Sequence, residues 1–216
     1  MELGADTDLK FVDIEVLGTS FSVAYADIGP QDGPVIVLVH GSPATYRTFR
    51  KMFHPLTESG FRMVMPNFPG MGYTEIDKKA IYNFSSAHKA EIVKAFIKAI
   101  DINSVETLVG FSSGGHVVAR VVADKEFHPI VKSLTFLSVP GGKPYSLVRP
   151  VYLIKFLGNL FYRTLSIPII GWLVTLLFMP VFRLVDLRAK TQKSKMYSVF
   201  EAAQLILNSA KKITCP

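Results

Sequence analysis

The first thirty residues alternate between polar and apolar side chains, which is the pattern of half-buried β-strands. Two such runs, LKFVDIEVLG at residues 9–18 and SFSVAYADIG at residues 20–29, meet near Gly18. Strands joined by so short a connection pair antiparallel. The pattern therefore predicts a β-hairpin at the start of the chain.

Beyond residue 33 the apolar runs become nearly continuous. PVIVLVHG at residues 34–41 is rich in β-branched side chains, as expected of a strand that is buried on both faces. Three further runs also read as strands: FRMVMP (61–66), VETLVGF (105–111) and IVKSLTFLSV (130–139).

Helix-like spacing fills the intervals between these strands. Residues 45–60 have this spacing, with Pro55 expected to bend or end the regular part. Residues 85–100 form a clear amphipathic helix that Ser85 or Ser86 can cap, and SGGHVVARVVADK at 113–125 is a further helix. The apolar face of the helix at 85–100 carries Val93, Phe96, Ile97 and Ile100. Strands that alternate with helices indicate an α/β fold, with a mainly parallel sheet and helices on both of its faces.

One junction in this pattern carries candidate chemistry. Residues Gly110-Phe111-Ser112-Ser113-Gly114 fit G-x-S-x-G between a strand and a helix, which is the setting of a nucleophile elbow. A sharp turn there holds the serine hydroxyl at the carboxyl end of the sheet, beside a helix N-terminus that favours negative charge. A simple strand-to-helix turn is the alternative interpretation.

Two further loops follow predicted strands. His40-Gly41-Ser42-Pro43 comes after the third strand, and NFPGMGYT at residues 67–74 comes after the fourth. Together with the G-x-S-x-G turn, and in this order, they resemble the α/β-hydrolase fold superfamily, most closely its branch with an H-G-x-P oxyanion loop. The resemblance covers roughly residues 9–142.

The resemblance implies a serine hydrolase that acts on an ester or related acyl bond. Ser112 would be the nucleophile, and the backbone amides of Ser42 and Ser113 would hold the oxyanion. The supporting motif residues are His40, Gly41, Pro43, Gly110 and Gly114. Asn67 stands where the family usually has Asp, at a position that mainly braces its loop. Epoxide hydrolases and haloalkane dehalogenases in the family use an Asp nucleophile, and Ser112 argues against their chemistry.

A serine nucleophile also needs a base, and the family order is Ser, then Asp or Glu, then His. After Ser112 the chain has only His116, on the helix that leaves the turn, and His128, before the next strand. Neither matches the family position, and the later acids Asp124, Glu126, Asp186 and Glu201 also lack the expected strand-end setting.

The 104 residues after Ser112 are too few for the remaining strand–helix units. We therefore expect a chain truncated before its last strands, its acid and its base, and inactive by itself. The alternative function is that of an inactive truncated isoform or pseudo-hydrolase that binds or regulates.

The net charge of +7 is unevenly distributed. Residues 1–142 carry 13 Lys and Arg against 15 Asp and Glu, whereas residues 143–216 carry 11 against 2. The composition changes near Gly141-Gly142, so we expect a hydrolase core at 1–142 and a basic, apolar, lid-like segment at 143–216. That segment is too apolar for a nucleic-acid-binding arm, and no nucleic-acid partner is expected.

Residues 164–182 contain no charged side chain. Three interpretations stay open: lid helices over an acyl pocket, an element on a membrane surface, and a membrane span. The first two favour a small acyl or lipid-like substrate and a membrane surface as partner.

The cysteine content and the N-terminal sequence bear on the cellular location of the protein. Cys215 is the only cysteine, so no intramolecular disulfide can form. The N-terminus lacks the basic and apolar regions of a secretory signal, which favours an intracellular protein with membrane association left open. No metal and no cofactor are expected.

Overall fold

The structure, a computed structural model, describes residues 8–75 and 85–140 together with Ile169 and Leu173. In chain order the elements are β1 (Lys10–Val16), β2 (Thr19–Ile28), β3 (Val35–Val39), the 3₁₀ helix η2 (Tyr46–Met52), α1 (Phe53–Glu58), β4 (Arg62–Pro66), α2 (Ser86–Ala99), β5 (Thr107–Phe111), α3 (Gly114–Val122), the 3₁₀ helix η3 (His128–Ile130) and β6 (Leu134–Leu137).

The strands of the described part form one sheet in the order β1-β2-β4-β3-β5-β6. The pairs β4–β3, β3–β5 and β5–β6 are parallel, while β1–β2 and β2–β4 are antiparallel. The expected hairpin is confirmed: Val16 pairs with Thr19, and the turn between them uses Leu17 at φ 51° and Gly18 at φ 74°. Two successive positive φ angles define the tight turn that suits a twisted hairpin.

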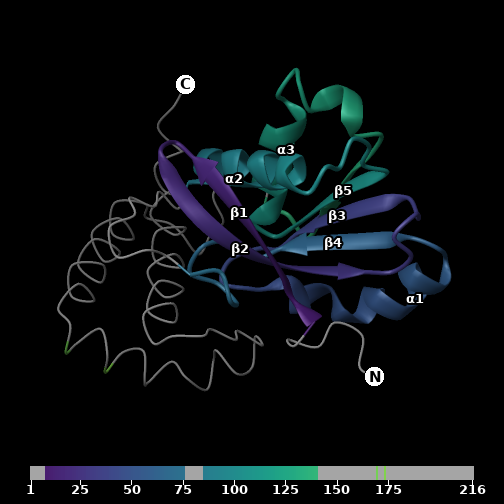
Figure 1. The fold of residues 1–216 in the computed structure, drawn as a ribbon, viewed down its shortest axis with the longest axis horizontal. Helices are drawn as coiled ribbons and strands as arrows, with labels where there is room; N and C mark the ends of the chain where they lie inside the picture. The colour runs from purple at the N-terminus through teal and green to yellow at the C-terminus, as the bar shows by residue number, and fades with distance from the viewer. Residues whose placement is uncertain (1–7, 76–84, 141–168, 170–172, 174–216) are drawn as a thin grey trace.

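Helices cover both faces of the sheet, as the alternating pattern predicts (Figure 1). Helices α2 and α3 pack on one face, and η2 and α1 pack on the other. Strand β3 lies between the two layers: Ile36 and Leu38 belong to one core, and Val37 and Val39 belong to the other. The prediction that this strand is buried on both faces is confirmed.

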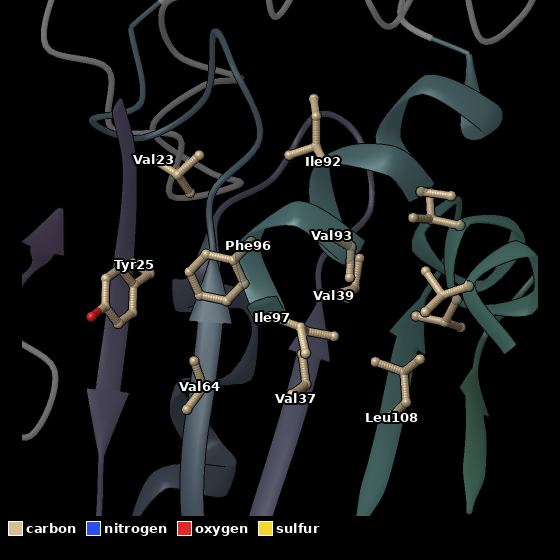
Figure 2. Close-up of a cluster of buried hydrophobic side chains, with 14 of the residues drawn as sticks. Val23, Tyr25, Val37, Val39, Val64, Ile92, Val93, Phe96, Ile97 and Leu108 are labelled. Atoms are coloured by element: carbon tan, nitrogen blue, oxygen red, sulfur yellow. The ribbon is translucent and has the colours of Figure 1, made fainter. Parts of the chain in front are cut away.

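Helix α2 shows how the sequence pattern becomes packing. The hydroxyl of Ser85 accepts a hydrogen bond from the His88 N–H and so caps the helix. Val93, Phe96 and Ile97 point onto the sheet (Figure 2) and are fully buried. The Phe96 ring meets the Tyr25 ring edge-on, with 5.1 Å between centroids, so β2 lies under the same helix.

Two elements differ from the pattern. Residues 45–60 do not form one helix: η2 changes into α1 at Phe53, and Pro55 lies in the first turn of α1, where its missing N–H leaves no bond unmade. Strand β6 spans four residues instead of the expected run 130–139, because η3 takes its start and Val131 makes only an isolated bridge to Val105.

The expected domain division and the lid, membrane-surface and span interpretations concern residues 143–216. This segment lies outside the described residues except for Ile169 and Leu173, which are helical and exposed. These expectations therefore stay predictions. Among the residues that the structure describes, no helix combines the length and the hydropathy needed to cross a bilayer.

Candidate functional site

The turn between β5 and α3 holds Ser112 in a strained backbone conformation. Its φ is 52°, a left-handed value that residues other than glycine rarely adopt. Its N–H donates to the carbonyl of Leu137 at 2.9 Å, and its carbonyl accepts from the Gly115 N–H at 3.0 Å. Both backbone groups of Ser112 are thus fixed, one by β6 and one by α3.

Three glycines let the strand and helix approach closely enough for this turn. A β-carbon on Gly110 would lie 2.6 Å from the Gly115 Cα, and one on Gly114 would lie 2.4 Å from the Val39 carbonyl oxygen. One on Gly115 would lie 2.1 Å from a methyl group of Val139. These positions admit no side chain.

The loop after β3 lies against Ser112. A β-carbon on Gly41 would come within 2.8 Å of the Ser112 Cβ and 3.4 Å of its Oγ. The following Ser42–Pro43 peptide is cis. Within residues 8–75 and 85–140, no acceptor takes the N–H of Ser42 or of Ser113, and the buried Ser42 Oγ has no hydrogen-bond partner. The site therefore combines a hydroxyl with two unengaged backbone donors.

His40 is fully buried, and its two ring nitrogens are both used. Nε2 accepts from the Phe68 N–H at 3.2 Å, so the proton resides on Nδ1, which donates to the Gly41 carbonyl at 2.6 Å. Burial lowers the pKa of His40 to about 3; the hydrogen bond to Gly41 opposes this shift and the charge of Lys89 adds to it. His40 is therefore a neutral brace of the loop and has no free nitrogen to act as a base.

Asn67 braces the neighbouring loop. Its Oδ1 accepts from the Tyr46 N–H at 2.9 Å, and its carbonyl accepts from the Thr74 hydroxyl at 2.9 Å. That hydroxyl also accepts from the Ala24 N–H. The Nδ2 atom, at the place where an aspartate would have its second carboxylate oxygen, is buried without a partner among the described residues. The amide thus supplies the brace through its oxygen alone.

Neither of the two histidines that follow Ser112 is hydrogen-bonded to its hydroxyl. His128 is the first residue of η3, which precedes β6. Because β5 and β6 are parallel, His128 lies at the amino-terminal end of these strands, and the Ser112 turn lies at their carboxyl end. His116 lies in the first turn of α3, and its N–H donates to the Ser113 carbonyl. Within the part of the chain that the structure describes, nothing is hydrogen-bonded to the Ser112 Oγ, and no group of three or more His, Cys, Asp or Glu is arranged to hold a metal ion.

Sequence reasoning missed Lys89, which is 3% exposed. The signal was present, because residue 89 is four positions before Val93 and seven before Phe96 and so falls on the apolar face of α2. A lysine on a buried face is rare unless it has a specific environment.

The left-handed φ of Ser112 predicts an inverted ranking of two substitutions. Glycine tolerates this angle and alanine does not, so Ser112→Gly should be more stable than Ser112→Ala by about 1 kcal/mol. At the exposed Ala119, inside α3, Ala119→Gly should instead be less stable than the parent alanine by about 1 kcal/mol. Urea unfolding of the three variants and the parent chain checks this; the same ranking of glycine and alanine at both positions would show that the turn at Ser112 is not strained.

Comparison with known proteins places these features in a family. The family model described as alpha/beta hydrolase fold matches residues 34–158. A haloalkane dehalogenase of Mycobacterium marinum is 28% identical over 136 residues, which cover 58% of this chain and 46% of that protein. The 2-hydroxy-6-oxononadienedioate/2-hydroxy-6-oxononatrienedioate hydrolase of Escherichia coli O139:H28 is 30% identical over 112 residues, covering 50% and 37% of the two chains.

A solved structure agrees at the level of the fold. A Klebsiella pneumoniae protein, provisionally described as an epoxide hydrolase, matches with a TM-score of 0.67 at 18% identity, covering 96% of this chain and 73% of that one. The present chain spans less than half the length of the two curated relatives.

Proposed function

Because this chain belongs to the α/β-hydrolase fold family, we propose that it carries the nucleophile and the oxyanion site of a serine hydrolase. The observation that carries the proposal is the Ser112 turn: a serine held at φ 52° at the end of β5, with Gly41 packed against it. Natural proteins retain such strain where function requires it.

The chemistry follows from the groups present. The Ser112 Oγ attacks a carbonyl carbon and gives its proton to a base, and the carbonyl oxygen becomes an oxyanion. The N–H groups of Ser42 and Ser113 then donate to that oxyanion, whose charge also benefits from the N-terminus of α3. Collapse of the tetrahedral intermediate expels the alcohol or other leaving group and leaves an acyl ester on Ser112.

The proposed substrate is an ester or related acyl compound. The names of the relatives cover dehalogenation and other hydrolyses, so they support hydrolysis in general and no particular bond. A serine hydroxyl favours a carbonyl centre, because the acyl-enzyme it forms is an ester that water can cleave. A lipid-like acyl group is a further proposal, which rests on the uncharged stretch at 164–182.

Among the described residues no base is hydrogen-bonded to the Ser112 Oγ, and added imidazole tests the proposal. A small imidazole can act as the base for Ser112. The 216-residue chain should cleave p-nitrophenyl esters at near-background rates, since loss of a triad's base costs several orders of magnitude. Imidazole should then raise the rate by about tenfold or more over imidazole alone, and Ser112→Ala should abolish this excess.

The control is Ser113→Ala, which keeps the backbone donor and should respond to imidazole like the parent chain. An excess that survives in Ser112→Ala would contradict the proposal. Ordinary enzyme rates without imidazole would instead show that the chain supplies its own base.

The Ser112 hydroxyl, unpaired among the described residues, also supports a second function, that of a family member that binds acyl compounds without turning them over. Fold alone does not separate the two, because activity depends on the site. A non-hydrolysable ester analogue that binds tightly, with no Ser112-dependent cleavage in imidazole, would favour this binding function.

A further inference from the structure

Lys89 is buried on α2, two turns before Phe96. Its Nζ lies 4.8 Å from the centroid of the Phe68 ring, on the face of that ring. Burial lowers the pKa of the ammonium from 10.5 to about 7. A lysine in this environment loses hydration that the cation–π contact only partly replaces.

Phe68 links Lys89 to the site. Its ring and the His40 ring form an edge-to-face pair with 5.0 Å between centroids, so Phe68 contacts both Lys89 and His40. The Phe68 N–H donates to His40 Nε2. Phe68 therefore contributes both a ring contact and a hydrogen bond to the histidine.

His40 connects Phe68 to the loop beside Ser112. Because Nε2 accepts from Phe68, the proton is held on Nδ1, where it bonds the Gly41 carbonyl. Gly41 in turn lies against the Ser112 side chain. The contacts thus run without a break from Lys89 through Phe68, His40 and Gly41 to the serine.

We propose that Lys89 is a positioning residue for the loop Gly41–Ser42: its side chain, seated on Phe68, holds that residue on His40 and so maintains the single tautomer that anchors the Gly41 carbonyl. The role of this loop in holding an oxyanion rests on the proposed function. The effect of Lys89 on the His40 tautomer is independent of that function.

Helix α2 also provides a matched control. Lys98 lies on the same helix with its Nζ 5.5 Å from the centroid of the Phe127 ring. Its side chain is 57% exposed and pairs with Glu126. Lys98→Met therefore removes the same kind of cation–π contact at a place with no connection to His40.

The test compares Lys89→Met, which keeps chain length and loses the charge, with Lys98→Met and the parent chain near pH 6. Amide hydrogen exchange is measured at Phe68 and at Leu108, in the buried part of β5, and ¹⁵N spectra of histidine report the His40 tautomer. In Lys89→Met we expect the Phe68 amide to exchange about tenfold faster, and His40 to show mixed tautomers. Leu108 should exchange no faster, because loss of a buried charge does not weaken the core. Lys98→Met should change neither signal.

A single His40 tautomer and unchanged Phe68 exchange in Lys89→Met would overturn the proposal. Equal acceleration at Phe68 and Leu108 would also overturn it, since that result means general destabilisation. Lys89→Arg retains the cation and is the second variant: it should keep one tautomer, and a folded Lys89→Arg chain with mixed tautomers contradicts the proposal even if Lys89→Met does not fold. These readouts need no catalysis, so a failure of Ser112 chemistry leaves them intact and is recognised separately.

Discussion

Replacing Lys89 by methionine is expected to raise the free energy of unfolding by roughly 3 kcal/mol at pH 6. Each unit of pKa depression corresponds to about 1.4 kcal/mol, so the fall from 10.5 to about 7 sets an upper limit of roughly 5 kcal/mol on the cost of the buried ammonium. Loss of the cation–π contact with Phe68 offsets part of the gain.

The sign of the pH dependence follows from proton binding. Between about pH 7 and pH 10.5 the unfolded chain holds a proton on Lys89 that the folded chain has lost. Stability of the parent chain should therefore rise with pH across this window through Lys89, and that contribution should be absent from Lys89→Met. The stability advantage of Lys89→Met should be largest below pH 7 and should shrink as the pH rises toward 10.5.

Urea unfolding at several pH values measures this difference, and other titrating groups cancel because both proteins contain them. Lys98→Met is the control, expected to stay within about 0.5 kcal/mol of the parent since its side chain is exposed. A Lys89→Met chain that is less stable than the parent at pH 6 would show that the ammonium is not desolvated as described.

Gly114→Ala is expected to destabilise the chain by about 3 kcal/mol, or to prevent folding. Alanine would ordinarily favour a helix by up to about 1 kcal/mol, so the sign is decided by contacts. The new β-carbon would lie 2.4 Å from the Val39 carbonyl oxygen and 2.7 Å from that of His40. Both are backbone atoms at the end of β3, which cannot turn aside as a side chain would.

Gly60→Ala serves as the comparison for this variant. Gly60 has φ 83°, and a β-carbon there meets nothing within 4 Å. Only the left-handed backbone penalises alanine, by about 1 kcal/mol. Thermal or urea unfolding should rank the parent first, Gly60→Ala second and Gly114→Ala last; a Gly114→Ala chain as stable as the parent would contradict the close approach of α3 to β3.

The helices and strands of this fold were predictable from the sequence where a local pattern of side chains determines the element. The hairpin at Gly18 and helix α2 follow from alternation, helical spacing and a serine cap, each a local property of the chain. The split of residues 45–60 into η2 and α1, and the short β6, depend on packing against neighbours. Periodicity alone does not contain that information.

The candidate site also has features that were predictable from the sequence and features that were not. The motif of Ser112 and the loop at His40 were visible in the sequence, because a strand–turn–helix junction is a local feature. The neutral tautomer of His40 was not, since it depends on the Phe68 N–H, 28 positions along the chain. Lys89 was hidden for a similar reason: its place on an apolar face was readable, but its contact with Phe68 requires the fold.

The assignment of Ser112 as the nucleophile is tested most directly by covalent trapping. A fluorophosphonate probe transfers its phosphonyl group to an activated serine with loss of fluoride, and mass spectrometry of the digested protein identifies the modified residue. We expect one phosphonyl group per chain, on Ser112. It should form slowly, because no base is hydrogen-bonded to Ser112 among the described residues and the oxyanion donors alone retain part of the rate acceleration. Ser112→Ala should take up none, and Ser113→Ala should be modified as the parent is. Modification of a different serine, or equal uptake by Ser112→Ala, would contradict the assignment.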